Sequence, residues 1–453
     1  MSTTATGQWR RHVAAIAFPF ANHPAVLLLL ARKLAESSPD VLFTFFGTEE
    51  STERTFKNGA SPLPNIVPHV VHDGVPDGHV IADRQREPIK LFLKEAEVSL
   101  KRGIEEAEAK VGVKISCVVS DAFMWFCGGI AAEKGASWVA FWTSGAASLS
   151  AHIHTDVFRS KFGRQGLEAR KDELVGTIPG FSTVRVRDLQ EGVLLGDFSS
   201  PFSQMLHSMA NVLTNATATV FNIYEELERD VVEDLKVKLK NYINVGPLSL
   251  LFPHQAAKSD DYGCIPFLEG RAHASVAYIA LGTVVIPPPH ELVALAEALE
   301  ASGITFIWSL KENAVALLPD GFKERTEGRG KVVPWAPQIA LLAHQAVGVF
   351  VSHGGWNSVM ESIIAGVPMI CRPFFGDHML NARYVETVWK VGTTVEVFTK
   401  TGTLEALERV IRTEEGNQMR ASVTALKCLV ESAVPPKGSS NKDLESLIEL
   451  VTE

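Results

Sequence analysis

The 453-residue sequence predicts an α/β protein made of two doubly wound domains, each with a parallel sheet that helices cover on both faces. Short apolar runs alternate with segments of helical periodicity in both halves of the chain. The runs are apolar at successive positions, which is typical of strands buried on both faces. The alternation stops over residues 249–262 and then restarts, which indicates a linker. At about 100–200 residues per domain, the length fits two or three domains, and the two series of strands and helices favour two.

Composition excludes several other classes of protein. The chain is 46% hydrophobic and 21% charged, as globular proteins are, and no apolar run is long enough for a transmembrane helix. Its 43 basic and 52 acidic residues give a net charge of −9, which argues against nucleic-acid binding. Five scattered cysteines favour reduced thiols and a cytoplasmic location. The apolar run Val13–Phe20 is broken by Pro19 and predicts a strand rather than a secretory signal.

The first predicted domain covers residues 1–248. Its apolar runs predict strands at His12–Phe18, Val41–Gly47, Ile115–Ser120, Trp138–Thr143, Ala218–Asn222 and Tyr242–Gly246. Helical periodicity predicts helices at Pro24–Glu36, Pro88–Val111 and Met124–Lys134. Residues 176–200 are rich in Gly, Pro and Ser and predict a loop.

A linker over residues 249–268 leads to the second predicted domain, residues 269–435. Its apolar runs predict strands at Ser275–Leu281, Thr305–Leu310, Lys331–Pro334, Val347–Val351 and Pro368–Arg372. Its helices are expected at His290–Ala301, Pro337–His344, Trp356–Ala365, Asp377–Lys390, Leu404–Thr413 and Gln418–Ser432. The last segment, residues 436–453, predicts a helix that packs back on the first domain.

Two polar residues follow strands of the first predicted sheet. His23 follows the first strand, and Asp121 ends the strand Ile115–Ser120. The carboxyl ends of parallel strands share one edge of a sheet, so the two side chains can meet there. A neutral histidine takes a proton from a hydroxyl near pH 7, and a carboxylate on its other nitrogen fixes the tautomer. The alternative is that His23 caps the next helix and Asp121 is a turn residue.

A Gly-Gly turn in the second domain predicts a phosphate site. Gly354 and Gly355 follow a strand, and Asn357 and Ser358 stand in the first turn of the next helix. Glycines let the backbone approach a ligand, and free N–H groups at a helix start attract a diphosphate. Glu361, one turn further along, is placed for ribose hydroxyls. Taken separately, these residues also fit a plain turn, and the neighbouring polar and aromatic residues fit packing and helix capping.

Together, the residues from Trp335 to His378 resemble the nucleotide-sugar box of plant family-1 glycosyltransferases, which move sugar from a UDP donor to a small acceptor. The matching positions are Trp335, Ala336, Pro337, Gln338, Leu342, His344, Ser352, His353, Gly355, Trp356, Asn357, Ser358, Glu361, Gly366, Val367, Pro368, Met369, Pro373, Asp377 and Asn381. Gly354 departs from the family, which usually has Cys there. Segments 18–23, 120–123, 141–152 and 371–375 look most like the flavonoid 3-O-glycosyltransferase branch.

The resemblance implies a GT-B fold, in which two Rossmann-like domains face a cleft, and it implies a role for each matching residue. His23 is the general base, and Asp121 orients it. The UDP-binding residues are Thr283, Trp335, Ala336, Gln338, His353, Asn357, Ser358 and Glu361. The sugar-binding residues are Thr143, Trp356, Asp377 and His378. The acceptor-binding residues are Phe18, Arg86, Phe123 and His152. An amide stands at the position of Arg86 in some relatives.

The expected reaction is inverting transfer of a sugar from a UDP donor to the 3-hydroxyl of a flavonol or anthocyanidin. No metal ion or other cofactor is expected, because the chain has neither HExxH nor paired His/Cys spacing, and no DxD ends a strand of the donor half. We expect a monomer without stable membrane insertion. Two alternatives are a protein that binds nucleotide sugars without turnover and an NAD-dependent dehydrogenase. The dehydrogenase requires GxGxxG after the first strand, where residues 18–23 contain no glycine.

His378 predicts the donor sugar. Glucose-using relatives usually have Gln at this position, and galactosyltransferases of the family often have His. Glucose and galactose differ only in the orientation of the C4 hydroxyl, so discrimination depends on which polar groups stay unpaired. A rigid imidazole offers one donor and one acceptor in fixed directions. The sequence therefore predicts a preference for UDP-galactose, with UDP-glucose, or another phenolic acceptor, as the alternative.

Overall fold

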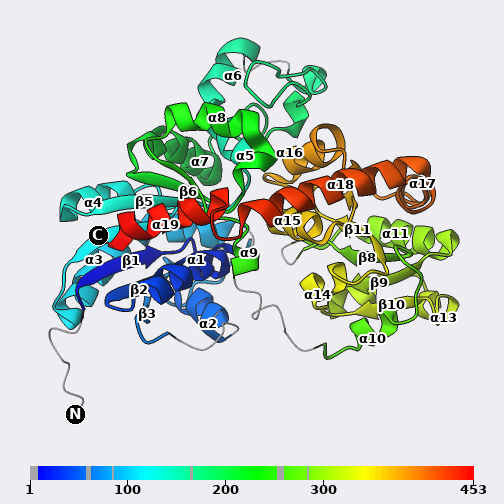
Figure 1. Cartoon of the computed structure of the whole chain (residues 1–453), viewed down its shortest axis with the longest axis horizontal. Coiled ribbons are helices and arrows are strands. Elements are labelled where there is room, and N and C mark those ends of the chain that lie inside the picture. The colour runs from blue at the N-terminus through cyan, green and yellow to red at the C-terminus, as the bar shows by residue number, and fades with distance from the viewer. Residues whose placement is uncertain are drawn as a thin grey trace. The chain divides into compact units, whose positions relative to one another are not determined.

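The computed structural model describes residues 9–57, 63–83, 86–163, 167–251, 260–282 and 285–452. The chain divides into two compact units. The first unit comprises residues 1–163, 191–252 and 433–453, and the second comprises residues 164–190 and 253–432. Each unit is built around its own parallel sheet (Figure 1).

The sheet of the first unit has the strand order β3-β2-β1-β4-β5-β6-β7, with every pair parallel. The strands are β1 Arg11–Ile16, β2 Val41–Gly47, β3 Ile66–Val70, β4 Ile115–Asp121, β5 Ser137–Trp142, β6 Ala218–Phe221 and β7 Tyr242–Asn244. The strand order reverses between β1 and β4. Doubly wound sheets bind their ligands at such a switch point.

Helices flank this sheet. They are α1 His23–Ser37, α2 Glu49–Lys57, α3 Glu87–Val111, α4 Cys127–Lys134, α5 Ala146–Ile153, α6 Thr155–Phe162, α7 Pro201–Val212, α8 Arg229–Lys238, α9 Leu248–Leu251 and α19 Ser439–Thr452. Helix α1 accommodates Pro24 in its first turn, where no N–H is needed. Helix α19 adds Leu444, Leu447 and Val451 to the core that α1 and the strands form. The Asn244 N–H also donates to Asp443 Oδ2 at 2.7 Å, so the last helix completes this core.

The sheet of the second unit has the order β10-β9-β8-β11-β12-β13, again all parallel. The strands are β8 Val276–Ala280, β9 Thr305–Ser309, β10 Gly330–Val333, β11 Val347–Ser352, β12 Met369–Cys371 and β13 Gly392–Thr394. The helices are α10 Cys264–Leu268, α11 Pro289–Ser302, α12 Glu312–Val315, α13 Phe322–Arg325, α14 Gln338–Leu342, α15 Trp356–Ala365, α16 His378–Arg383, α17 Lys400–Arg412 and α18 Glu414–Ala433. Here the switch point lies between β8 and β11.

One boundary differs from the domains predicted for the sequence. The described residues 167–190, which we name the crossing segment, belong to the second unit although they stand within the predicted first domain. Arg383 and Tyr384 of the second unit donate hydrogen bonds to backbone oxygens of this segment. Part of the predicted linker, residues 252–259, lies outside the described residues, and its last five residues form α10.

The sequence analysis missed two strands, β3 and β13, and both lie at sheet edges. In β3, most residues are at least partly exposed, and β13 is only three residues long. Edge strands need no continuous apolar run, so the pattern used for the inner strands does not reveal them. The predicted helix Asp377–Lys390 is divided into α16 and a π-helical turn at Tyr384–Val388.

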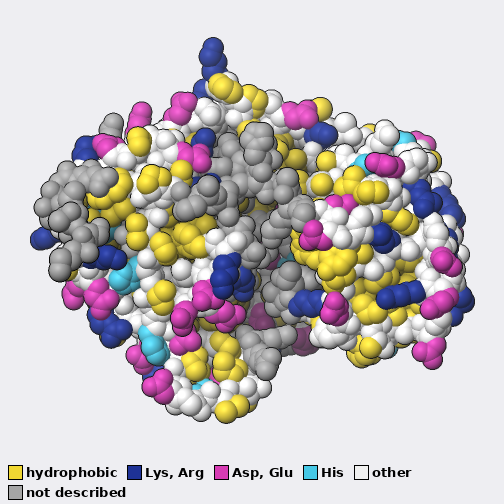
Figure 2. Space-filling model, turned by 90° about the horizontal axis from the view of Figure 1, so that it is seen from below, with side chains coloured by type: hydrophobic (Ala, Val, Ile, Leu, Met, Phe, Trp, Pro, Cys, Tyr) yellow, Lys and Arg dark blue, Asp and Glu magenta, His cyan; other side chains and the backbone are white. Residues whose placement is uncertain are grey.

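The described surface mixes both signs of charge. On the face shown in Figure 2, Lys and Arg side chains alternate with Asp and Glu side chains, and no broad described area carries one sign. No helix in the described ranges has the length and apolarity needed to cross a membrane.

Candidate active site

The structure brings His23 and Asp121 together at the switch point of the first sheet. Strands β1 and β4 are parallel neighbours, with Ile16 beside Ser120. Asp121 ends β4, and the chain after β1 turns through residues 17–22 to begin α1 at His23. His23 Nδ1 and Asp121 Oδ2 are 2.7 Å apart, although 98 residues separate them in sequence.

The geometry of this pair distinguishes the two nitrogens of the imidazole. Asp121 is 1% exposed, and its second oxygen accepts the Phe123 N–H at 2.9 Å. A buried carboxylate on Nδ1 favours the tautomer whose proton is on Nδ1. The His23 side chain is 18% exposed, and its Nε2 has no hydrogen-bond partner among the described residues. Nε2 is therefore the nitrogen that can accept a proton from a substrate.

Thr143, predicted to contact the sugar, lies beside the same histidine. Its Oγ1 is 3.4 Å from His23 Nδ1. Thr143 follows directly after β5, the neighbour of β4, so three adjacent strands deliver His23, Asp121 and Thr143 to one edge of the sheet. The predicted strand Trp138–Thr143 already placed Thr143 at this edge, and the structure adds its distance from the histidine.

Aromatic side chains surround His23. Its ring centroid is 4.8 Å from that of Phe123 and 5.3 Å from that of Phe18. Phe123 also contacts Trp142, with centroids 5.8 Å apart, and the Trp142 ring lies 6.2 Å from His152. Three predicted acceptor residues, Phe18, Phe123 and His152, thus belong to one chain of rings. Flat apolar walls of this kind suit a flat aromatic ligand.

Two of the predicted acceptor residues differ in their surroundings. His152 is buried, and burial, together with the neighbouring His207, lowers its pKa to about 4, so it is neutral at pH 7. Arg86 is exposed at the start of α3. Hydrogen bonds from Ser199 lower the pKa of Asp197, and the charge of Arg86 adds a smaller effect in the same direction. The described contacts do not bring Arg86 to the ring cluster.

Helix α15 offers an open N-terminus at the switch point of the second sheet. It begins at Trp356, directly after the turn that follows β11, and its N-cap residue, Gly355, has no side chain that could cap the helix. Gly354 adopts a φ of +78°, which glycine tolerates best. A Cβ at Gly355 would lie 2.4 Å from His353 Nε2. Gly355 therefore makes room for the His353 ring beside a helix start that suits an anion.

A network of polar side chains links α14 to α15. Gln338 Nε2 donates to Glu361 Oε2 at 2.6 Å and to Ser358 Oγ at 3.3 Å. The Tyr278 hydroxyl donates to Gln338 Oε1 at 3.1 Å. Burial raises the pKa of Glu361, and the Gln338 hydrogen bond opposes that shift. Three predicted UDP-binding residues therefore lie together, and Tyr278 is a fourth member that the sequence analysis missed.

His353, which is half-buried, and His378, which is buried, form a pair of adjacent rings. Their centroids are 4.7 Å apart and their planes are nearly perpendicular. Burial lowers the pKa of His353 to about 3 and that of His378 to about 4, so both are neutral at pH 7. The Nδ1 atom of each ring is buried and has no hydrogen-bond partner in the described part of the chain. Buried polar atoms usually have partners, so the pair is suited to a polar ligand.

The remaining predicted residues divide between exposed and buried positions. Trp335 is 36% exposed, whereas Ala336 and Trp356 are buried. Asp377 precedes α16 and accepts a hydrogen bond from Asn381 Nδ2 at 2.9 Å. Thr283 lies outside the described residues.

Asn381 is a second residue whose role the sequence analysis missed. Its Nδ2 also donates to the Gly354 oxygen at 2.9 Å. The side chain thus ties α16 to the Gly-Gly turn. Asn381 is one of the positions that match the family, but only the structure shows what its side chain contacts. Within the described ranges, no group of three or more His, Cys, Asp and Glu side chains is arranged to hold a metal ion.

Comparison with known proteins identifies the family. Residues 79–426 match the model for UDP-glucoronosyl and UDP-glucosyl transferases. The chain is 47% identical to an anthocyanidin 3-O-glucosyltransferase of Vitis vinifera, over 100% of this chain and 99% of that protein. It is 49% identical to an anthocyanidin 3-O-galactosyltransferase of Rhododendron delavayi, over 97% of each. A crystal structure of UDP-glucose: anthocyanidin 3-O-glucosyltransferase in complex with UDP matches with a TM-score of 0.92 at 40% identity, covering 98% of this chain and 99% of that one. These matches confirm the predicted fold class, and the chain belongs to the UDP-glycosyltransferase family.

Proposed function

We propose that this chain transfers a sugar from a UDP-sugar to the 3-hydroxyl of a flavonoid, either a flavonol or an anthocyanidin. The observation that carries the proposal is the 2.7 Å contact between His23 Nδ1 and Asp121 Oδ2, within a set of aromatic rings. Non-catalytic sugar binding would not require a histidine whose tautomer a buried carboxylate controls. The acceptor class is supported by relatives that act on anthocyanidins and by a relative from Arabidopsis thaliana named a flavonol 3-O-glucosyltransferase.

The reaction proceeds by direct displacement. The acceptor hydroxyl gives its proton to His23 Nε2 while its oxygen attacks the anomeric carbon of the sugar. The bond from that carbon to the diphosphate oxygen breaks, and UDP leaves with the bonding electrons. A donor with an α linkage gives a β-linked product. Asp121 stabilises the imidazolium that forms, as the carboxylate does in a Ser-His-Asp triad, and the acceptor hydroxyl takes the place of the serine.

The leaving diphosphate is stabilised by the start of α15. The N-cap residue Gly355 brings no capping side chain, and the helix dipole favours negative charge there. His353 adds a neutral imidazole that can donate a hydrogen bond. Trp335 stacks on uracil, and Gln338 and Glu361 hold the ribose. This proposal requires no metal ion.

UDP-galactose is the proposed donor, with UDP-glucose as the alternative. The proposal depends on His378, whose Nδ1 has no partner among the described residues and can pair with a sugar hydroxyl. Relatives of both donor types are similar to this chain, so their names do not distinguish the sugars. We further propose a monomer and a cytoplasmic location. The location is in keeping with the five cysteines, all described and none in a disulfide.

One experiment tests the proposed function. Purified protein is incubated with a flavonol or an anthocyanidin and with UDP-galactose or UDP-glucose, with and without EDTA, and products are identified by mass spectrometry and NMR. We expect a β-linked 3-O-glycoside whose yield EDTA does not change. His23→Ala should lower turnover by about 10²- to 10⁴-fold, because the general base is lost.

Controls separate catalysis from folding and donor binding. His23→Ala should keep the UDP affinity of the wild type, because His23 and the UDP-binding residues belong to different units. His72→Ala, at a side chain that is 53% exposed, should keep full activity. A His23→Ala variant that keeps half its turnover would refute the proposed base. Loss of product with EDTA and recovery with Mg²⁺ would refute the metal-free reaction.

A further inference from the structure

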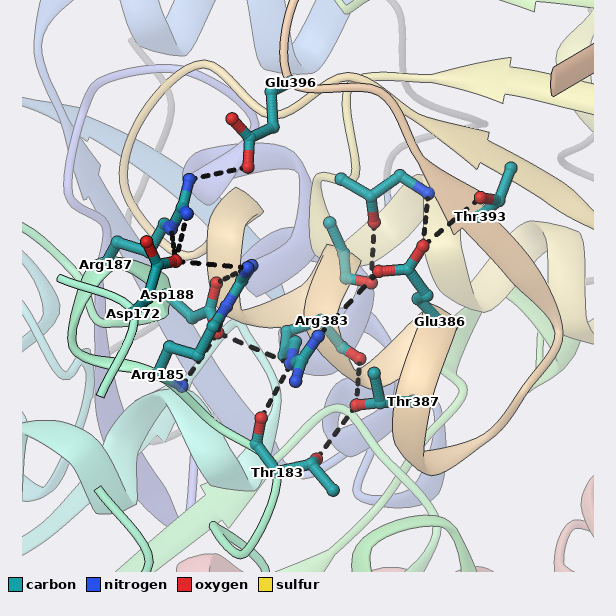
Figure 3. A network of polar contacts seen from close by, with 12 residues as sticks. Asp172, Thr183, Arg185, Arg187, Asp188, Arg383, Glu386, Thr387, Thr393 and Glu396 are labelled. Carbon is teal, nitrogen blue, oxygen red and sulfur yellow. Dashed lines mark hydrogen bonds and ion pairs between the residues drawn. The ribbon is translucent and has the colours of Figure 1, made fainter. Parts of the chain in front are cut away.

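The crossing segment lies against the end of α16 and the π-helical turn (Figure 3). Arg383 Nε donates to the backbone oxygen of Thr183 at 2.7 Å, and the Tyr384 hydroxyl donates to the backbone oxygen of Gly180 at 2.9 Å. The hydroxyls of Thr183 and Thr387 are also hydrogen-bonded, at 2.9 Å. Residues about 200 positions apart in sequence therefore hold one another in place.

Asp188 is the buried charge at the centre of these contacts. Its carboxylate accepts three hydrogen bonds from Arg185, through the backbone N–H at 2.8 Å, Nε at 2.9 Å and Nη2 at 2.7 Å. Asp188 also forms an ion pair with Arg383 Nε, at 3.5 Å, and this contact joins the crossing segment to α16. The Asp188 side chain is 5% exposed, so losing its charge would leave the partly buried guanidinium groups of Arg185 and Arg383 with fewer partners.

The other arginines of this cluster also have acidic partners. Arg187 pairs with Asp172 and, at 2.7 Å, with Glu396. Arg372 binds both oxygens of Glu291, at 2.8 and 2.6 Å. Because these charges are already paired within the protein, the cluster is better suited to fixing segments of chain than to binding an anion.

A cavity of about 260 Å³ lies beside the cluster. Its lining includes Arg185, Arg187, Arg372, Phe374, Met379 and Arg383. Met379 is the residue of α16 that follows His378. A close-packed core resists displacement of a helix, whereas a cavity does not. On this side, therefore, the polar contacts with the crossing segment limit the movement of α16.

The opposite end of α16 touches the predicted donor site. Asp377 precedes the helix, His378 is its first residue, and Asn381 binds both Asp377 and the Gly354 oxygen. A helix of six residues moves as one body, so a displacement at Arg383 would be felt at His378 and at the Gly-Gly turn.

We propose that Asp188 and Arg383 are positioning residues for the donor sugar: by fixing the crossing segment on α16, they determine where Asp377 and His378 stand. The inference rests on the proposed function, which pairs His378 with the sugar, and on the family resemblance, which implies the same role for Asp377. It separates two parts of donor binding, because the sugar contacts of Asp377 and His378 depend on α16, whereas Trp335, Gln338 and Glu361 hold the nucleoside on other elements.

The test measures binding of UDP, UDP-galactose and UDP-glucose to the full chain by calorimetry. Asp188→Asn and Arg383→Gln keep approximate size and remove one charge each. We expect UDP-sugar affinity to fall about two- to thirty-fold, the range typical of mutations that act through a coupled element, with UDP affinity unchanged. Tyr384→Phe and Thr387→Val each remove one hydrogen bond to the crossing segment and should shift UDP-sugar affinity in the same direction by less.

Arg325→Gln is the matched control. It breaks a two-point ion pair with Glu300, at 2.7 and 3.1 Å, elsewhere in the same unit, and should leave both affinities unchanged. Equal losses for UDP and UDP-sugars, or wild-type affinities in all folded variants, would overturn the proposal. If the charge variants do not fold, Tyr384→Phe and Thr387→Val decide by the same criterion. Because binding needs no turnover, inactivity of the wild type toward flavonoids would contradict the proposed function without obscuring this result.

Discussion

At the scale of single residues, the two nitrogens of His23 have different surroundings. Nδ1 faces a buried carboxylate at 2.7 Å and a threonine hydroxyl at 3.4 Å, whereas Nε2 has no described partner. Such asymmetry separates a base from a histidine that merely packs, because both nitrogens of a structural histidine are usually satisfied. His12 shows the contrast, since its two nitrogens contact the Val113 oxygen and the Thr44 hydroxyl.

Replacement of Asp121 by Asn tests the carboxylate. The amide keeps the size of the side chain but stabilises neither the Nδ1–H tautomer nor the imidazolium, so turnover should fall about 10²- to 10⁴-fold. UDP affinity should stay the same. The measurement is steady-state kinetics with a flavonol at saturating donor. Asp40→Asn, which breaks an exposed pair with Arg10, is the control. Unchanged turnover in Asp121→Asn would remove Asp121 from the mechanism.

Replacement of His378 by Gln tests donor choice. Because the flexible amide offers its donor and acceptor in other directions than the imidazole, the preference should move from galactose toward glucose, by about ten-fold or more. The assay is competition between equal concentrations of the two UDP-sugars, with both products quantified. A wild type that uses glucose faster, together with an unshifted variant, would exclude His378 as the specificity residue.

At the scale of elements, the geometry of the donor half depends on how closely two glycines approach the His353 ring. Gly282 and Gly355 flank the ring, and a Cβ at either would come within 3.1 Å of it. His378 closes another side, with its ring edge to face. The ring therefore has little freedom to move when a neighbour grows by one carbon.

Replacement of Gly355 by Ala uses this confinement. The new Cβ would lie 2.4 Å from His353 Nε2, and overpacking of this kind costs about 1–3 kcal/mol. UDP affinity should therefore fall about ten-fold or more in calorimetry. Gly129→Ala is the matched control, since the Cβ at this position in α4 meets nothing within 4 Å and alanine favours helix. Equal UDP affinities in the two variants would show that the ring moves away freely.

At the scale of the whole molecule, each unit has its own hydrophobic core, and each core is accompanied by neutral histidines. The core of the first unit joins β1, β2, β4, β5, β6, α1 and α19, and that of the second unit joins β8, β9, β11, α11 and α17. Burial lowers the pKa of His152 to about 4 in the first unit, and it lowers the pKa of His353 and His378 to about 3 and about 4 in the second.

Because of these histidines, we expect acid to destabilise the protein at pH values well above those at which carboxylates titrate. In the unfolded chain they bind protons below pH about 6.5, but in the folded chain only near pH 3–4, so the unfolded state binds more protons in between. Stability should therefore fall as the pH falls from 7 to 5, by about 2 kcal/mol for each histidine.

Chemical denaturation at pH 7 and pH 5 measures this dependence. His152→Gln should reduce the difference between the two pH values by about 2 kcal/mol, because the amide does not titrate. His72→Gln, at an exposed side chain, should leave the difference unchanged. Identical pH dependence in the wild type and in His152→Gln would contradict a buried neutral His152.

Much of the fold could be predicted because inner parallel strands are apolar throughout and alternate with helices. The edge strands β3 and β13 could not, because half-exposed or very short strands lack that pattern. The unit boundary could not be predicted either. The crossing segment belongs to the second unit through long-range contacts such as that of Arg383 with Thr183, and no local pattern encodes such contacts.

The sequence by itself determined the family resemblance and the residue types of the candidate site, because the box from Trp335 to His378 is continuous in the chain. It also predicted that His23 and Asp121 reach one sheet edge, because parallel strands end together. The three-dimensional arrangement was needed to learn which nitrogen of His23 faces Asp121, that His353 and His378 are neutral neighbours, and that α16 is held by the crossing segment. These properties depend on distances and burial between residues far apart in the chain, which periodicity and spacing do not contain.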